Sequence, residues 1–131
     1  MHLRTVLRLI VILPALLFLM IGLRWLVDPG TIAAETGVVL GEGVGRSSQI
    51  ADFAAFFLTL GLCILLGVVS QQPLWFYPPV LLLLLAAASR LLAWVLHDGA
   101  FTGGLILFEI VVAGLLLAAA RAMPAKTEEG R

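Results

Sequence analysis

Charged residues are scarce in this sequence. Asp, Glu, Lys and Arg together make up 12% of its 131 residues, about half the share that is usual in a soluble domain. Hydrophobic residues make up 62%. A chain of this length cannot hide so much apolar surface from water, because a small domain leaves much of its surface exposed. The composition therefore favours one domain whose main solvent is lipid.

Other scarcities exclude classes of function. Cys63 is the only cysteine, so the chain forms no intramolecular disulfide, and no set of histidines and cysteines has the spacing of a zinc site. The eight basic residues balance eight acidic ones and form no tract, which argues against nucleic-acid binding. The glycine-rich stretch Gly41–Gly45 lacks the lysine of a phosphate-binding loop. With no nucleophile, haem-ligand or flavin motif, the sequence favours a protein that is not an enzyme and carries no metal or cofactor.

Four apolar runs are long enough to cross a membrane, which takes about 20 mainly apolar residues. They predict an all-α integral membrane four-helix bundle, with transmembrane helices at about residues 9–27, 50–69, 74–96 and 104–120. The transmembrane domain covers residues 1–121, and a polar cytoplasmic tail follows at 122–131. The first run also follows two arginines, as a signal peptide does, but it is long for one and no convincing cleavage site follows it. We therefore expect a retained helix.

The segment between the first two runs is rich in turn-forming residues. The stretch Asp28–Gly30 predicts the end of the first helix. The hydroxyls of Ser47 and Ser48 predict an N-terminal cap for the second helix. Residues 32–40 fit either a short helix on the outer surface or a cap over the bundle.

Small and aromatic residues predict where helices touch and where the membrane ends. Glycines near the spans let helices approach closely, and we expect this of Gly61, Gly67, Gly103 and Gly104. Tryptophan and tyrosine prefer the membrane–water interface, and we expect this of Trp25, Trp75 and Tyr77.

The orientation follows from the basic residues, which gather on the cytoplasmic side of membrane proteins. Five of the eight lie in the N-terminal segment and the tail: Arg4, Arg8, Arg121, Lys126 and Arg131. The other three lie toward the opposite side: Arg24, Arg46 and Arg90. This bias predicts that both termini are cytoplasmic.

Ionisable residues within apolar spans are costly in lipid, so they mark a site of function or of pairing. Arg90 lies six residues before the outer end of the third span, and Glu109 lies five residues after the start of the fourth. At about 1.5 Å per residue, both lie roughly 7–9 Å below that end. A direct Arg90–Glu109 ion pair is therefore predicted. The same comparison of depths predicts a second pair between Arg24 and Asp52.

These charges all fall in the outer half of the spans, where helix geometry adds other side chains. Arg90, Trp94 and His97 follow at spacings of four and three, so they share one helix face. If such faces turn inward, the bundle holds a polar pocket that is open to the outer surface and partly lined by Phe56. Its predicted wall consists of Arg24, Asp52, Arg90, Trp94, His97 and Glu109. Pockets of this kind bind small amphipathic molecules.

Other interpretations stay open beside ligand binding. Two buried ion pairs can fix the register of the helices with no ligand at all. Titration of Glu109 or Asp52 suits a small proton-coupled transporter. The polar cluster also suits contact with a partner membrane subunit or a second copy of the chain.

Three stretches, GVGRSSQIADFAAFFL, SRLLAWVLHDG and LFEIVVAGLLL, resemble a family of small bacterial membrane proteins of unknown function that are loosely similar to DoxX-like proteins. The resemblance covers roughly residues 5–121. It implies four helices, with an acid opening the second at Asp52, an arginine ending the third at Arg90 and a glutamate in the fourth at Glu109. It implies the bacterial inner (plasma) membrane as the location. DoxX-like relatives are associated with redox or quinone-linked membrane systems, which implies a lipid or quinone-like ligand, or a role as accessory subunit of a membrane redox or lipid enzyme.

Overall fold

The fold is entirely helical over residues 2–123, the part of the chain that the computed structural model describes. In chain order the elements are α1 (His2–Val27), α2 (Pro29–Glu35), α3 (Gly43–Ser70), the 3-10 turn η1 (Pro73–Phe76), α4 (Tyr77–Leu96) and α5 (Gly103–Ala122). The predicted all-α four-helix bundle is confirmed. α1, α3, η1 with α4, and α5 are each long and apolar enough to cross a membrane, which indicates an integral membrane protein.

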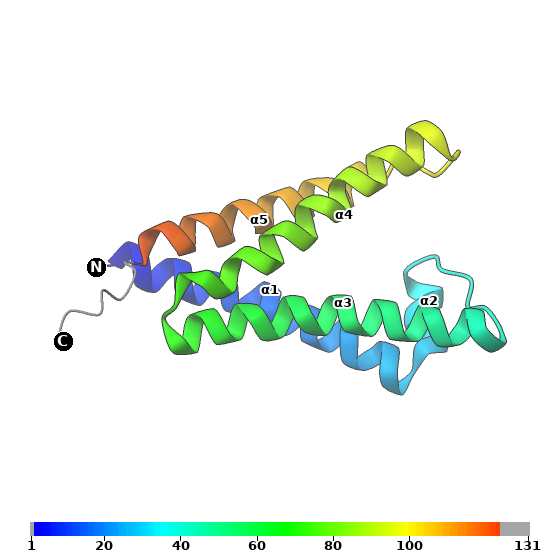
Figure 1. Cartoon of the computed structure of the whole chain (residues 1–131), viewed down its shortest axis with the longest axis horizontal. Coiled ribbons are helices and arrows are strands. Elements are labelled where there is room, and N and C mark those ends of the chain that lie inside the picture. The colour runs from blue at the N-terminus through cyan, green and yellow to red at the C-terminus, as the bar shows by residue number, and fades with distance from the viewer. Residues whose placement is uncertain (1, 124–131) are drawn as a thin grey trace.

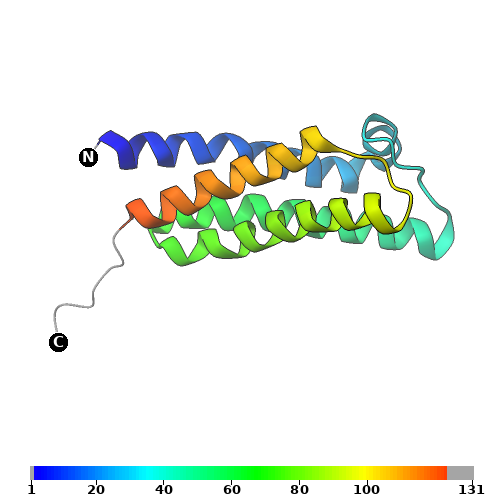
Figure 2. The ribbon, with the colours of Figure 1, turned by 90° about the horizontal axis from the view of Figure 1, so that it is seen from above.

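The four long helices run side by side along the length of the molecule (Figure 1). The start of α1 and the end of α5 lie at one end, and α2 with the linker that follows it lies at the other (Figures 1 and 2). We call the end with the start of α1 and the end of α5 the inner end, and the end with α2 the outer end. α4 separates from α3 toward the outer end (Figure 1).

The main core lies between α1, α3, η1, α4 and α5. Its fully buried large side chains are Val11, Leu60, Ile64, Phe76, Leu83 and Leu116. Large apolar side chains are also exposed along the outside of all four long helices. Such an exterior matches a bundle whose sides are covered by lipid.

A smaller cluster of buried residues fixes α2 at the outer end. Ile32 and Ala33 of α2 pack with Trp25 of α1 and Ala54 of α3. The segment that follows the first span is therefore a short helix that is docked onto the bundle.

α1 and α3 begin earlier than the sequence predicts. α1 extends to His2 and α3 starts at Gly43, seven residues before the predicted start at residue 50. Ser47 and Ser48 therefore lie inside α3, and the predicted serine cap is wrong. Glu42 occupies the N-cap position, without a side-chain hydrogen bond to the helix.

Side chains of the first turns of α3 hold the preceding linker, which explains the early start. Gln49 Oε1 accepts a hydrogen bond from the Gly41 amide at 2.7 Å, and Gln49 Nε2 donates to the Val39 carbonyl at 2.9 Å. Arg46 Nε donates to the Gly41 carbonyl at 2.9 Å. These bonds join the linker to helical residues that the apolar pattern alone does not include.

The third span begins with two kinds of helix. Residues 73–76 form the 3-10 turn η1, and α4 starts at Tyr77 rather than at the predicted residue 74. Pro78 and Pro79 then lie in the first turn of α4, where a missing backbone N–H costs nothing because that group has no partner within the helix.

The end of α5 lies slightly beyond the predicted boundary of the tail. α5 ends at Ala122, and Met123 is buried. Residues 124–131 of the predicted tail, with Lys126 and Arg131, lie outside the described residues.

Two of the four glycines expected at close contacts are confirmed. A Cβ on Gly61 would lie 2.8 Å from the Ala15 carbonyl oxygen, so α1 and α3 need a glycine there. A Cβ on Gly67 would lie 2.7 Å from the ring of Phe76. Gly103–Gly104 meets no other helix, and that expectation is wrong.

Candidate functional site

The site is built around Arg90 of α4 and Glu109 of α5. Their Nε and Oε1 atoms lie 2.7 Å apart, a direct charge-assisted hydrogen bond. The two helices are joined by residues 97–102, so each residue lies six positions from the outer end of its own helix. Equal depth on neighbouring helices brings them together, as the sequence predicts.

The two partners differ in burial. The Glu109 side chain is 8% exposed, whereas that of Arg90 is 38% exposed. Glu109 Oε2 is buried and has no hydrogen-bond partner. Buried polar atoms are almost always hydrogen-bonded, and within residues 2–123 no other buried side-chain acceptor lacks a partner.

Glu109 and Arg90 line a cavity of about 300 Å³ in the outer half of the bundle, which we call the aromatic cavity. Most of its wall is apolar, and all five helices or the segments beside them contribute. The lining residues are Phe18, Ile21, Trp25, Thr36, Val38, Phe53, Phe56, Phe57, Leu83, Arg90, Leu105, Phe108 and Glu109.

Contacts between rings hold the aromatic wall in place. The Trp25 and Phe53 rings stack with centroids 4.5 Å apart and an interplanar angle of 11°. The Phe18 ring meets Phe108 edge to face, with centroids 6.1 Å apart, and lies at the same distance from Phe57. These distances between ring centroids are typical of favourable aromatic pairs. Among the aromatic residues that line the cavity, only Phe56 was predicted to lie in the pocket.

Arg24 pairs with a different acid from the one predicted. Its Nη1 lies 2.7 Å from Glu35 Oε2, and the structure gives Asp52 no ion pair within residues 2–123. The prediction failed because α2 places Glu35 directly beside Arg24, while the early start of α3 puts Asp52 about 14 Å along that helix. The hydrogen bond from the Arg24 guanidinium holds the pKa of Glu35 below its ordinary value.

Asp52 is exposed and lies in a groove between α3 and α4. This groove of about 410 Å³, which we call the lateral groove, is lined by Asp52, Phe53, Phe56, Phe57, Ala86, Ser89, Arg90 and Ala93. Asp52 and Arg90 are thus brought to one surface, although they are not paired directly.

The remaining predicted pocket residues lie apart from the aromatic cavity. Trp94 is half exposed and its ring packs on Phe101, with centroids 4.9 Å apart. His97 is exposed at the end of α4. Arg24 lies at the outer end with Glu35.

The aromatic residues expected at the interfaces divide in two. Trp75 and Tyr77 are exposed near the inner end, where they can meet the membrane surface. Trp25 is 1% exposed, so its placement in an interfacial belt is wrong. Its contacts with Phe53 and α2 place it in the interior.

Arg8, like Glu109, has a buried polar atom without a hydrogen-bond partner. Its Nη2 donates to the Val68 carbonyl at 3.2 Å, and its Nε is buried without a hydrogen bond. Val68 lies in the last turn of α3, where carbonyls lack partners within the helix. Arg8 therefore joins α1 to α3 at the inner end.

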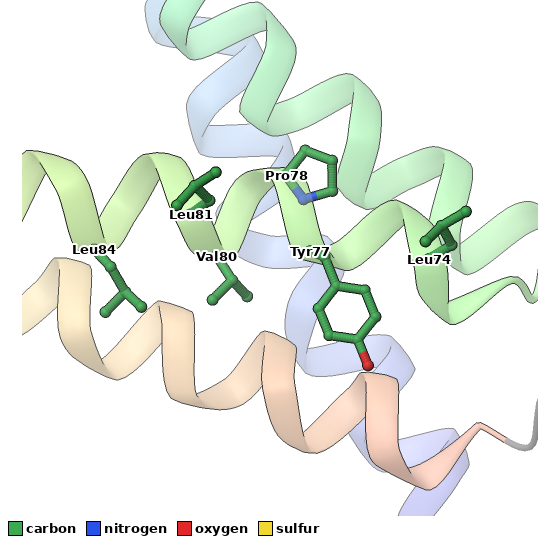
Figure 3. Close-up of a pocket in the computed structure, with 6 residues that line it drawn as sticks. All are labelled: Leu74, Tyr77, Pro78, Val80, Leu81 and Leu84. Atoms are coloured by element: carbon green, nitrogen blue, oxygen red, sulfur yellow. The ribbon is translucent and has the colours of Figure 1, made fainter.

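A further hollow of about 550 Å³ lies on η1 and α4 near the inner end (Figure 3). Tyr77 supplies the only side-chain polar atom among its six lining residues, and its ring points toward α5 (Figure 3). The others are Leu74, Pro78, Val80, Leu81 and Leu84. A hollow with so little polar lining has few means to orient a ligand, so we do not include it in the site.

Comparison with protein-family models, curated proteins and solved structures gave no match. Within residues 2–123, no three His, Cys, Asp or Glu side chains lie close enough together to hold a metal ion. The chemistry that the site offers is therefore that of a carboxylate, a guanidinium and an aromatic wall.

Proposed function

We propose that this protein binds one small amphipathic molecule, lipid or quinone-like, in the aromatic cavity. The observation that carries the proposal is the buried Glu109 Oε2, an acceptor without a partner in a residue that lines the cavity. The volume of about 300 Å³ lies at the lower end of the range for ligand pockets. The polar head of the ligand lies against Glu109 and Arg90, and its apolar part lies against the rings.

The location that we propose is the inner (plasma) membrane of a bacterium, with the inner end of the bundle in the cytoplasm. The charges support this orientation. Within residues 2–123 the inner end carries Arg4, Arg8 and Arg121, and the outer half carries Arg24, Arg46 and Arg90. The basic bias toward the inner end comes from Lys126 and Arg131, which follow Arg121 in the sequence. The resemblance to DoxX-like proteins supports the same membrane and a ligand from a redox-linked system.

Native mass spectrometry of protein extracted in mild detergent tests the proposal. Wild-type protein is expected to retain a small molecule as a mass adduct. Val38→Trp, which fills the cavity from the linker, is expected to lose it. Val39→Trp is the matched control, because Val39 is the exposed neighbour and does not line the cavity. An adduct retained equally by Val38→Trp, or absent from the wild type, would contradict the proposal.

A proton-coupled carrier is the second candidate, and one observation favours it. Asp52 is an exposed carboxylate without an ion pair within residues 2–123, and it shares the lateral groove with Arg90. Vesicles that hold the protein and a pH-sensitive dye would reveal proton flux. Asp52→Asn is expected to abolish a flux that depends on this carboxylate, and Asp98→Asn, in the outer connection, is the control. No flux in the wild type, or the same flux in Asp52→Asn, counts against the carrier.

A further inference from the structure

The aromatic cavity and the lateral groove share part of their walls. Phe53, Phe56, Phe57 and Arg90 line both. These four side chains are therefore all that the two linings have in common, and they stand between the groove and the cavity. The groove and the cavity that holds Glu109 are therefore neighbours.

The groove exists because α4 packs unevenly along its length. The buried residues of α4 are Pro79, Val80, Leu83 and Ala87, and none follows Ala87. The α4 residues that line the groove are small, apart from Arg90: Ala86, Ser89 and Ala93. In Figure 1 the α4 ribbon leaves α3 toward the outer end. The small α4 side chains on this stretch leave the space that forms the groove.

The direction in which the groove faces decides what can enter it. It lies between two of the apolar helices that are long enough to cross a membrane. If these helices span the bilayer, the groove opens sideways, toward the lipid. The linker residues Thr36 and Val38, which follow α2 at the outer end, form another part of the cavity wall. The side of the bundle therefore offers a route from the bilayer itself.

We propose that the lateral groove is the entrance by which a membrane-dissolved amphiphile reaches Glu109, and that this amphiphile carries a hydroxyl or N–H group that donates to Oε2. The inference rests on the proposed function and adds the route and the class of head group. An ionised carboxylate only accepts hydrogen bonds, so a head group with acceptors alone leaves Oε2 unsatisfied. The Glu109 carboxylate would repel an anionic head group. The Arg90 charge, which could offset this repulsion, is already paired with Glu109.

Trp25 supplies a reporter, because it lines the cavity and is buried. Trp75→Phe with Trp94→Phe leaves it as the only tryptophan. In vesicles, a ring-brominated alkylphenol is expected to quench its fluorescence saturably. The methyl ether of the same phenol lacks the donor and should bind about tenfold more weakly, since a hydrogen bond to a charged group contributes at least that factor.

The route is tested by kinetics in the same protein. Ser89→Phe narrows the groove and is expected to slow both association and dissociation of the phenol by about tenfold, with little change in affinity. Ala88→Phe is the matched control, because Ala88 is exposed on α4 and does not line the groove. Phe56→Ala, which removes a ring shared by groove and cavity, is expected to speed both rates.

The outcomes separate the claims. Saturable quenching with unchanged rates in Ser89→Phe overturns the route and leaves the binding proposal standing. Equal affinity for phenol and ether overturns the class of head group. Absence of saturable quenching by either probe overturns the proposed function and this inference with it.

Discussion

One carboxylate oxygen of Glu109 accepts a hydrogen bond from Arg90, and the other is buried without a hydrogen-bond partner. Arg90 is more exposed, so the two charges depend on the pair unequally. The Arg90 guanidinium is on a long side chain and can turn toward the membrane surface. The Glu109 carboxylate, on a side chain that is 8% exposed, cannot reach that surface. The pair therefore stabilises the buried acid more than it stabilises the arginine.

Single and double substitutions should reveal this inequality. Arg90→Gln leaves a buried, unpaired carboxylate and is expected to cost about 3 kcal/mol. Glu109→Gln leaves an arginine that can reach solvent and is expected to cost about 1 kcal/mol. Thermal unfolding in mild detergent gives both values.

The double variant provides the control for that comparison. Arg90→Gln with Glu109→Gln should be more stable than Arg90→Gln alone, because no charge remains buried. Equal losses in the two single variants, or a double variant as unstable as their sum, would mean that burial does not decide the energetics of the pair.

Glu35 predicts a dependence on acid pH at the outer end. The pKa of Glu35 is lowered in the folded protein by the hydrogen bond from Arg24. Its contribution to stability is therefore complete above its ordinary pKa of about 4.3 and is lost as the pH falls through the lower folded value. Wild-type protein should exceed Glu35→Gln in thermal stability at pH 7, and the difference should shrink and then vanish as the pH falls through the lowered pKa of Glu35. Because both side chains are well exposed, the difference is expected to be small.

A second substitution separates the pair from a general effect of losing an acid. Glu42→Gln removes an acid from the same outer connection, where Glu42 is the N-cap of α3. It should keep the loss of stability that the wild type shows as the pH falls below the ordinary pKa of Glu35. A Glu35→Gln difference that persists at low pH would show that the charge pair is not its source.

The two predicted ion pairs show how well the depth of charged residues in the spans predicts their partners. Arg90 and Glu109 lie on helices joined by a short connection, so equal depth left few other partners. Arg24 had a competitor, Glu35, in a segment where the sequence gives no clear periodicity. Counting residues from helix ends cannot find a partner in a segment whose structure is unknown.

At the scale of elements, apolar length located all four spans, but it located their ends poorly. Hydrophobicity marks the part of a helix that lipid covers, whereas the first turns of α3 are polar and are tied to the linker by Arg46 and Gln49. The sequence predicted a pocket with Phe56, Arg90 and Glu109, but most of its aromatic lining was missed for a related reason. Phe53, Phe57 and Phe108 look like ordinary lipid-facing residues until the helix rotations are known.

Packing of α1 against α3 predicts a strong effect of one methyl group. At Gly61 a new Cβ would lie 2.8 Å from the Ala15 carbonyl oxygen, a backbone atom that cannot rotate away. Gly61→Ala is therefore expected to cost about 1–3 kcal/mol as the helices separate. Gly114→Ala is the control, because nothing lies within 4 Å of a Cβ there. It should be neutral or slightly stabilising. Equal thermal midpoints for the two variants would contradict the close contact.

At the scale of the whole molecule, the helix lengths and the positions of the arginines on α1 both fit a bundle that spans a bilayer. α1 and α3, with 26 and 28 residues, are about 39 and 42 Å long, so both extend beyond a hydrocarbon core of about 30 Å. Arg8 and Arg24 lie near opposite ends of α1, about 24 Å apart along the helix. Their separation suits a bilayer in which each arginine reaches one surface.

The orientation of the bundle can be tested by labelling single cysteines in intact cells. Cys63→Ala removes the only native thiol. In that background Ala100→Cys lies in the outer connection and Gln72→Cys in the inner one, and both positions are exposed. With both termini cytoplasmic, a membrane-impermeant maleimide is expected to label Ala100→Cys directly and Gln72→Cys only after permeabilisation. The reverse pattern would invert the bundle and place the three inner arginines outside. Labelling of both before permeabilisation would mean that the charge bias does not fix a single orientation.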